Sequence, residues 1–72
     1  MNKNHQVAYQ VVDEINDVTI DYKFTIKEAV SSARDYLDTF LEDEYTQVSI
    51  IKYRKYNDRF YREKFIGYVN RK

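Results

Sequence analysis

The 72-residue chain contains no cysteine, no proline and no tryptophan, and it has one glycine and one histidine. Without cysteine it has no disulfide and no cysteine-based zinc site, the usual supports of very small domains. Glycine-rich phosphate loops need several glycines, whereas Gly67 is alone. The histidine, His5, lies close to the N-terminus, and no nucleophile–base pair is recognisable. The sequence therefore predicts a protein that is not an enzyme and that binds no metal and no cofactor.

Long apolar runs are missing as well. No stretch approaches the roughly 18 residues that a membrane-spanning helix needs, and residues 1–10 lack the apolar core of a secretory signal. The absence of cysteine fits a reducing compartment. We therefore expect no membrane association and a cytoplasmic location, which is the host cytoplasm if the protein is viral.

No linker, repeat or low-complexity segment divides the chain, so residues 1–72 are expected to form a single domain. A domain this small buries only about 60% of the surface of its unfolded chain, and its stability is marginal. The aromatic content of 17% favours a core of large side chains. The alternative is that a partner chain completes the core, which leaves a homodimer open.

The clearest predicted element is an amphipathic helix from about residue 26 to residue 43. Thr25 and Glu28 have the spacing of a capping box at its start. Residues 42–44 are all acidic and would meet the negative end of the helix dipole, which costs roughly a few tenths of a kcal/mol each. A local rule broken without compensation points to function. The apolar residues recur at steps of three and four and form one stripe: Ile26, Ala29, Val30, Ala33, Leu37, Phe40 and Leu41.

Four strands are expected around this helix. Strict alternation over residues 18–24 predicts a half-buried strand that places Val18, Ile20, Tyr22 and Phe24 on one side. Residues 6–15 fit a strand or a helix, and their three valines favour the strand. Two longer strands, about 46–56 and 59–69, flank a tight turn at Asn57 and Asp58. The order ββαββ predicts an α+β fold with one helix packed on a mainly antiparallel four-stranded sheet.

The two C-terminal strands are apolar on both faces. A two-residue turn would pair Tyr53 with Arg62, Lys52 with Glu63 and Ile50 with Phe65. One face would then carry Val48, Ile50, Tyr61, Phe65 and Val69, and the other would carry Ile51, Tyr53, Phe60, Ile66 and Tyr68. A single helix covers only one face of a sheet. We therefore expect the second face to meet a partner or a second copy of the chain.

The charges are sorted along the chain. Residues 1–51 carry ten acids and four bases, a formal charge of −6, and residues 52–72 carry eight bases and two acids, a formal charge of +6. This asymmetry predicts charged partners. The candidate acidic surface, which would imitate a row of phosphates, consists of Asp35, Asp38, Glu42, Asp43 and Glu44. The candidate basic hairpin, for a protein or nucleic-acid partner, consists of Tyr53, Arg54, Tyr56, Arg59, Phe60 and Arg62.

In size and composition the chain resembles the class of small virus-encoded inhibitors of host defence nucleases, which includes anti-CRISPR proteins. We therefore expect a non-catalytic binding module, encoded by a virus or mobile element, that docks on and modulates or blocks a nucleic-acid-handling host protein. The acids at the predicted helix end favour the acidic surface for this contact. The alternative is direct binding of single-stranded RNA or DNA by the basic hairpin, with bases stacked on its aromatic rings and phosphates held by lysine and arginine.

Overall fold

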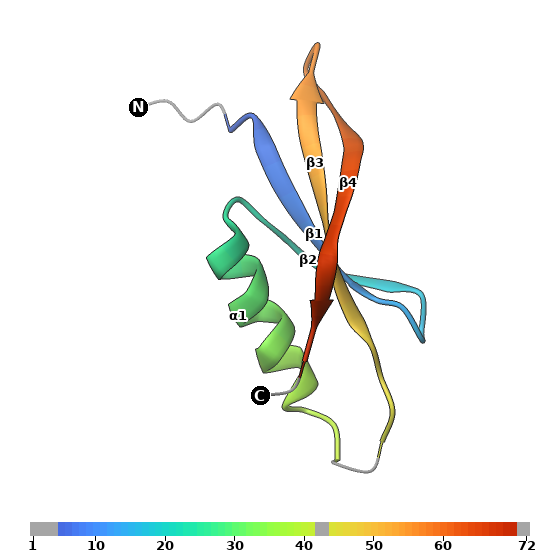
Figure 1. Ribbon diagram of the computed structural model, residues 1–72. Helices are drawn as coiled ribbons and strands as arrows, with labels where there is room; N and C mark the ends of the chain where they lie inside the picture. The colour runs from blue at the N-terminus through green and yellow to red at the C-terminus, as the bar shows by residue number, and fades with distance from the viewer. Residues whose placement is uncertain (1–4, 42–43, 71–72) are drawn as a thin grey trace.

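The computed structural model describes residues 5–41 and 44–70. The elements follow the order β1 (Val7–Asp13), β2 (Val18–Lys23), α1 (Ile26–Leu37), β3 (Val48–Tyr56) and β4 (Arg59–Val69). The strands form one antiparallel sheet in the order β2-β1-β3-β4, and α1 packs against one face of it (Figure 1). The predicted α+β fold with the order ββαββ is confirmed, and the ambiguous segment at residues 6–15 contains a strand.

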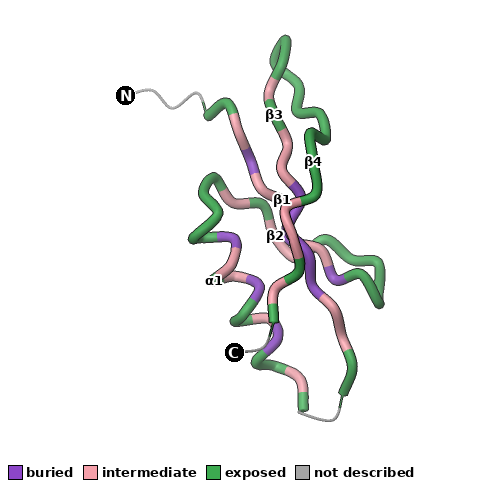
Figure 2. Tube along the Cα trace, in the orientation of Figure 1, coloured by how far each residue is buried: buried purple, intermediate pink, exposed green. Residues whose placement is uncertain are grey.

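The core is a thin layer between α1 and the centre of the sheet. Three buried residues at intervals of four, Ala29, Ala33 and Leu37, form the inner stripe of the helix. They pack against Val11, Val48 and Ile50, which are at most 2% exposed. Because the two alanines are small, the helix lies close to the strands. The buried segments in Figure 2 are accordingly concentrated on the inner side of α1 and the middle of β1 and β3.

The start of α1 follows the predicted cap. The Thr25 hydroxyl oxygen accepts a hydrogen bond from the Glu28 backbone N–H at 3.1 Å, and Thr25 has extended backbone angles. This bond satisfies one of the amide groups that the first turn of any helix leaves without an intrahelical partner.

The predicted end of α1 at about residue 43 is wrong, because the helix stops at Leu37. Beyond it, the backbone bonds from Thr39 to Tyr36 and from Phe40 to Leu37 close tighter three-residue turns. The Thr39 hydroxyl also donates to the Tyr36 carbonyl at 2.7 Å, a side-chain bond that competes with helix continuation. Phe40 is therefore half-buried after the helix, with its ring edge-on to Tyr36 at 5.1 Å.

A buried carboxylate joins the β1–β2 turn to the helix. Asp13 is 0% exposed, and its Oδ1 accepts from the backbone N–H groups of Ile15 and Asn16, each at 3.0 Å. Its Oδ2 accepts from the Asn16 side-chain amide at 2.9 Å and from the Tyr36 hydroxyl at 2.6 Å. Burial raises the pKa of this carboxyl, but the hydrogen bonds from Tyr36 and Asn16 outweigh burial and hold the pKa at about 2. The same contact with Asp13 raises the pKa of the Tyr36 hydroxyl.

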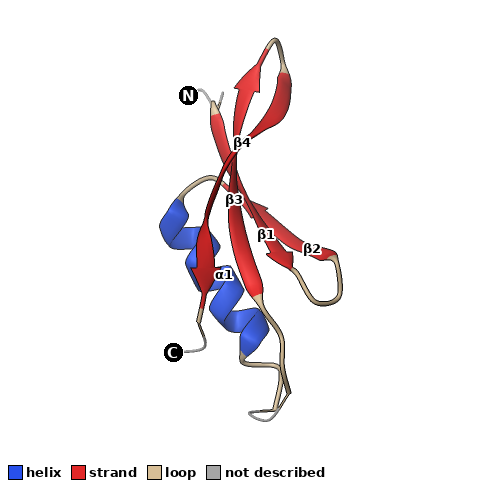
Figure 3. Ribbon diagram, turned by 45° about the vertical axis from the view of Figure 1, so that its right-hand side comes forward, coloured by secondary structure: helices blue, strands red, loops and turns tan. Residues whose placement is uncertain are grey.

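The β3–β4 hairpin turns at Asn57 and Asp58, as predicted. Their φ angles of 52° and 65° are those of a two-residue hairpin turn. The turn lies at one end of the molecule, well beyond α1, so the outer half of the hairpin has the helix on neither side (Figures 1 and 3). No helix within residues 5–41 and 44–70 has the length and apolar character needed to cross a bilayer.

Two irregularities change the predicted pairing of the hairpin. Tyr53 pairs with Arg62 as expected, but Ile50 pairs with Gly67 and Ile51 pairs with Phe65. Each irregularity places one extra residue in β4, at Glu63 and at Ile66, as a β-bulge does. The expected pairs Lys52–Glu63 and Ile50–Phe65 are therefore wrong. The face assignment of two residues is reversed, because Ile66 packs against the core and Phe65 shares the opposite face with Ile51.

Candidate binding surface on the uncovered sheet face

The sheet face opposite α1 is called the uncovered face. Val48 and Ile50 point into the core, so every other residue of β3, from Ser49 to Lys55, points to the uncovered face. Across the ladder, their β4 partners Phe60, Arg62, Phe65 and Tyr68 lie on this face too. Tyr22 joins them from β2, because it pairs with Gln10, which pairs in turn with Ile51.

Aromatic side chains on the uncovered face remain accessible to solvent. Phe60, Phe65, Tyr22 and Tyr68 are between 41% and 55% exposed. Isolated exposed apolar residues are normal, but a contiguous set of rings on one open face is typical of an interaction surface. No helix in the described part of the chain covers this face; the Glu14 carboxylate from the β1–β2 turn reaches it and accepts a hydrogen bond from Ser49, which is 0% exposed.

Five residues line an apolar depression of about 400 Å³ on the uncovered face, which we call the aromatic groove: Ala8, Tyr22, Phe24, Tyr53 and Phe60. The ring centroids of Tyr22 and Tyr53 are 6.5 Å apart, and their planes meet at 78°. His5 stacks on Phe24 at 3.9 Å with nearly parallel planes, which extends the aromatic surface toward the N-terminus. Ala8, only 6% exposed, has a short side chain that leaves space between the rings.

Arg62 separates the aromatic groove from a second aromatic pair. It is the ladder partner of Tyr53, and it lines a shallow polar depression together with Ile51 and the acidic residues Glu14 and Asp17. Further along β4, Phe65 and Tyr68 contact each other edge-on with centroids 5.0 Å apart. The uncovered face of β4 therefore presents ring, cation, ring and ring in sequence.

Basic residues of the hairpin lie on both sheet faces. On the helix side, one carboxylate oxygen of Glu63 lies 3.6 Å from the Lys52 Nζ and 3.1 Å from the Arg54 Nε. On the uncovered face, Lys55 and Arg62 form no ion pair with a described residue, although the depressions that they line also contain Asp58 for Lys55 and Glu14 and Asp17 for Arg62. Arg59 and Lys64 on the helix side of β4 form no ion pair within the described residues either.

The six residues predicted for the basic hairpin are divided between the two faces. Tyr53, Phe60 and Arg62 lie together on the uncovered face. Arg54 pairs with Tyr61 and lies on the helix side. The last pair before the turn, Tyr56 and Arg59, also lies on the helix side.

Several residues of the aromatic groove were missed by sequence reasoning. Alternation over residues 18–24 groups Tyr22 and Phe24 with Ile20, but β2 contains an irregularity at Ile20, where Val11 pairs with Asp21 and Val12 pairs with Thr19. Ile20 therefore packs against the core, whereas Tyr22 and Phe24 line the aromatic groove. The two aromatic residues in this segment, Tyr22 and Phe24, were the one feature of the sequence that could have indicated the groove.

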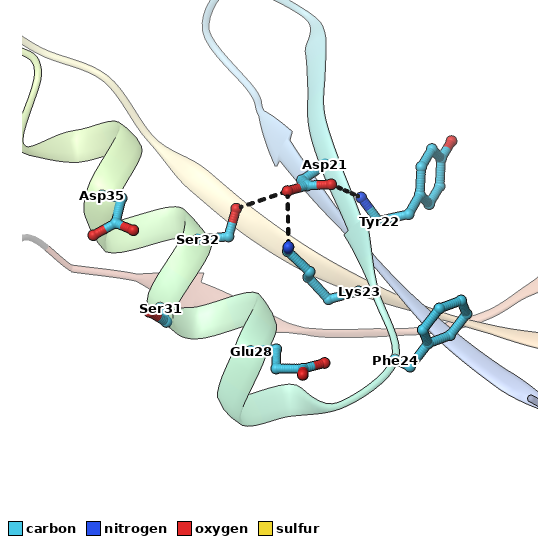
Figure 4. A pocket seen from close by; sticks show the side chains of 8 residues that line it. All are labelled: Asp21, Tyr22, Lys23, Phe24, Glu28, Ser31, Ser32 and Asp35. Carbon is cyan, nitrogen blue, oxygen red and sulfur yellow. Dashed lines mark hydrogen bonds and ion pairs between the residues drawn. The ribbon is translucent and has the colours of Figure 1, made fainter.

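The acidic surface has a different setting. Asp35 is exposed on α1 and lines a polar depression of about 520 Å³ between α1 and β2 (Figure 4). In this depression the Asp21 carboxylate accepts from the Tyr22 backbone N–H at 2.8 Å, lies 3.3 Å from the Lys23 Nζ and accepts from the Ser32 hydroxyl at 3.4 Å. The hydrogen bond from the Tyr22 backbone N–H lowers the pKa of Asp21, and the Lys23 contact lowers it further. Burial of the carboxylate opposes both effects. The Asp21 carboxylate in this depression therefore already has partners within the protein.

The dipole argument, which concerned residues 42–44, is wrong, because α1 ends at Leu37. Asp38 is the C-cap residue, and the Glu44 carboxylate accepts from the Leu41 backbone N–H at 3.0 Å in the following loop. Glu44 thus has a local structural contact and no unfavourable place in a last helical turn. Glu42 and Asp43 lie outside the described residues.

Within residues 5–41 and 44–70, no three histidine or acidic side chains come close enough together to hold a metal ion. Comparison with known proteins found no similarity: no family model, no curated protein and no solved structure matches this chain. A function therefore has to be inferred from the surfaces of the molecule itself.

Proposed function

We propose that the protein is a non-catalytic binding module that contacts nucleic acid through the uncovered face. The observation that carries this proposal is the combination, on one open sheet face, of exposed aromatic rings with the basic residues Lys55 and Arg62, which form no ion pair within the described residues. Rings bind nucleobases by stacking, and lysine and arginine bind phosphates.

The positions of the lysine and arginine residues support a partner that carries many negative charges. Lys55 and Arg62 flank Tyr53 and Phe60 on the uncovered face, and Arg59 and Lys64 lie on the edge strand β4. None of these four has an ion-pair partner within the described part of the chain. Residues 52–69 carry six bases and two acids, a formal charge of +4. A partner rich in negative charge would be attracted to this part of the molecule over a distance of about one Debye length.

Fluorescence anisotropy with a labelled oligonucleotide of mixed sequence tests the proposal. Two to four phosphate contacts predict a slope of log K against log salt of about −1.5 to −3 for a single strand. Arg62→Glu should weaken binding by roughly tenfold or more at low salt and make this slope shallower by about 1. Lys27→Glu is the matched control, because Lys27 is an exposed base on α1, which packs against the other face of the sheet.

Equal binding by the Arg62→Glu and Lys27→Glu proteins would contradict the proposal, and so would binding that is independent of salt. Circular dichroism on both variants checks that each retains the fold.

The second candidate is docking of the acidic surface on a nucleic-acid-handling protein, as a virus-encoded inhibitor would do. It is favoured by the exposure of Glu28, Asp35 and Asp38, which have no basic partner within the described residues. The C-terminal end of α1, which has Asp38 as its cap residue, lies at the opposite end of the molecule from the β3–β4 turn (Figure 1). Affinity capture from the source cell with the parent and with the Asp35→Lys/Asp38→Lys double variant tests it. A partner retained equally by both proteins rules it out.

A further inference from the structure

We infer that the nucleic acid bound by the uncovered face is single-stranded and that one of its bases enters the aromatic groove, an inference that rests on the proposed function. Three features of the molecule support it: the shape of the groove, the spacing of side chains along β4 and the positive charge beside the rings.

The aromatic groove offers ring faces and edges, without a hydrogen-bonding pattern that would read a particular base. Tyr22 and Tyr53 meet nearly at right angles at 6.5 Å, so a planar group placed against one ring meets the edge of the other. Such stacking is available only to a base whose face is free. In a duplex the base faces are covered by neighbouring base pairs, and this groove has nothing to contact there.

The order of side chains along β4 suits a chain that alternates bases and phosphates. Phe60 at the groove and Phe65 at the second aromatic pair are five residues apart with one bulge between them, a separation of roughly 13–17 Å at about 3.3 Å per strand residue. Arg62 lies between these rings on the same face. Bases seated at the two aromatic positions would therefore leave the intervening phosphates beside the Arg62 guanidinium.

Positive charge lies beside these rings. Lys55 and Arg62 on the uncovered face form no ion pair within the described residues, and they are the ladder partners of Phe60 and Tyr53. Arg59 and Lys64 on the helix side of β4 form no such ion pair either, so the charge alone does not select a face. On the uncovered face, rings and basic residues together give a single strand stacking and phosphate contacts along one surface.

The test compares an oligothymidylate of about 12 nucleotides, within the range of a single binding fold, with a duplex of the same length in anisotropy titrations at low salt. We expect the single strand to bind at least about tenfold more tightly than the duplex. Tyr22→Leu and Phe60→Leu should each weaken single-strand binding by roughly 5- to 100-fold, the usual effect of losing one stacking ring. Leucine keeps an apolar side chain at these exposed positions.

Tyr61→Leu is the matched control for Tyr22→Leu. Both tyrosines are on strands and are similarly exposed, 52% for Tyr61 and 55% for Tyr22, but Tyr61 pairs with Arg54 on the helix side. Tyr61→Leu should leave single-strand binding unchanged within about twofold. If circular dichroism finds Tyr22→Leu unfolded, Phe60→Leu near the hairpin turn decides the result.

The outcomes separate this inference from the proposed function. If duplex and single strand bind equally, or if Tyr22→Leu and Phe60→Leu have no effect while Arg62→Glu still abolishes binding, the inference is overturned and the proposed function stands. Polyglutamate serves as a peptide polyanion: if it binds as tightly as oligothymidylate and neither depends on Tyr22 or Phe60, the surface recognises acidic protein. Failure of both oligonucleotides to bind overturns the proposed function together with the inference.

Discussion

Replacing Asp13 by asparagine tests the polar network that joins α1 to the β1–β2 turn. The folded protein holds the pKa of Asp13 at about 2, against an ordinary value of 3.8. Since one pKa unit corresponds to about 1.4 kcal/mol, the ionised carboxylate contributes roughly 2 kcal/mol to the free energy of unfolding at neutral pH. The asparagine side chain would also turn a donating amide toward the Tyr36 hydroxyl or the Asn16 amide, both of which donate to Asp13 now. We therefore expect the substitution to cost about 2–4 kcal/mol at pH 7.

The pH dependence gives this prediction its sharper form. Because the folded pKa lies below the unfolded pKa, the stabilisation is complete above pH 3.8 and is lost as the pH falls toward about 2. The difference in unfolding free energy between the parent and Asp13→Asn should thus shrink by roughly 2 kcal/mol over that interval. Urea titrations followed by circular dichroism at a series of pH values measure it.

Asp58→Asn is the control, because Asp58 is exposed in the β3–β4 turn at a φ of 65° that asparagine also adopts readily. It should leave both the stability and its pH dependence nearly unchanged. The reasoning is refuted if the Asp13→Asn protein loses as much stability on acidification as the parent does, because the acid sensitivity then comes from other groups.

Three further substitutions test the fold. Leu37→Ala, at the buried end of the helix stripe, should cost about 2–5 kcal/mol, and a thermal melt within a few degrees of the parent would contradict the core assignment. Thr25→Ala removes the cap bond to Glu28 and should cost about 1 kcal/mol in urea unfolding, whereas Thr25→Ser should be nearly neutral. Gly67→Ala forces a side chain into a φ of 158° and should cost roughly 1–3 kcal/mol; equal stability would mean that the bulge relaxes.

Local signals in the sequence predicted the parts of the fold that depend on neighbouring residues. The Thr25 cap, the stripe of Ala29, Ala33 and Leu37, and the Asn57–Asp58 turn each involve residues within one or two turns of the chain. The end of α1 was not predictable in the same way. No glycine or proline marks it, and the Thr39 side-chain bond that accompanies it is one of several options open to a threonine.

The register of the strands depended on long-range packing that alternation does not encode. β4 is apolar on both sides, so a shift of one residue exchanges one set of aromatic residues for another with little change in pattern. The bulge at Glu63 therefore reversed the expected faces of Phe65 and Ile66, and the bulge at Ile66 restored those of Tyr68 and Val69. The irregularity at Ile20 reversed the expected face of Tyr22. Half of the candidate site was predicted, with Tyr53, Phe60 and Arg62 placed together, because these three lie between the turn and the first bulge, where the two-residue turn still fixes the faces.

Because the core is small, we expect ligand binding to stabilise the fold of this protein. The helix contributes two alanines and one leucine to the buried layer, a small apolar area for a chain without disulfides, while most of the large aromatic side chains remain outside it. A sequence selected for stability alone would place those rings under the helix, where each would contribute about 1.5–3 kcal/mol by burial. Because these rings are exposed, the free energy of their burial does not contribute to the stability of the free protein. A ligand that covers them adds RT ln(1 + [L]/Kd) to the free energy of unfolding, about 2.7 kcal/mol at a hundredfold excess over Kd. For a marginally stable domain this term is a large share of the total, so we expect the proposed ligand to raise the free energy of unfolding substantially when it covers the aromatic residues of the hairpin.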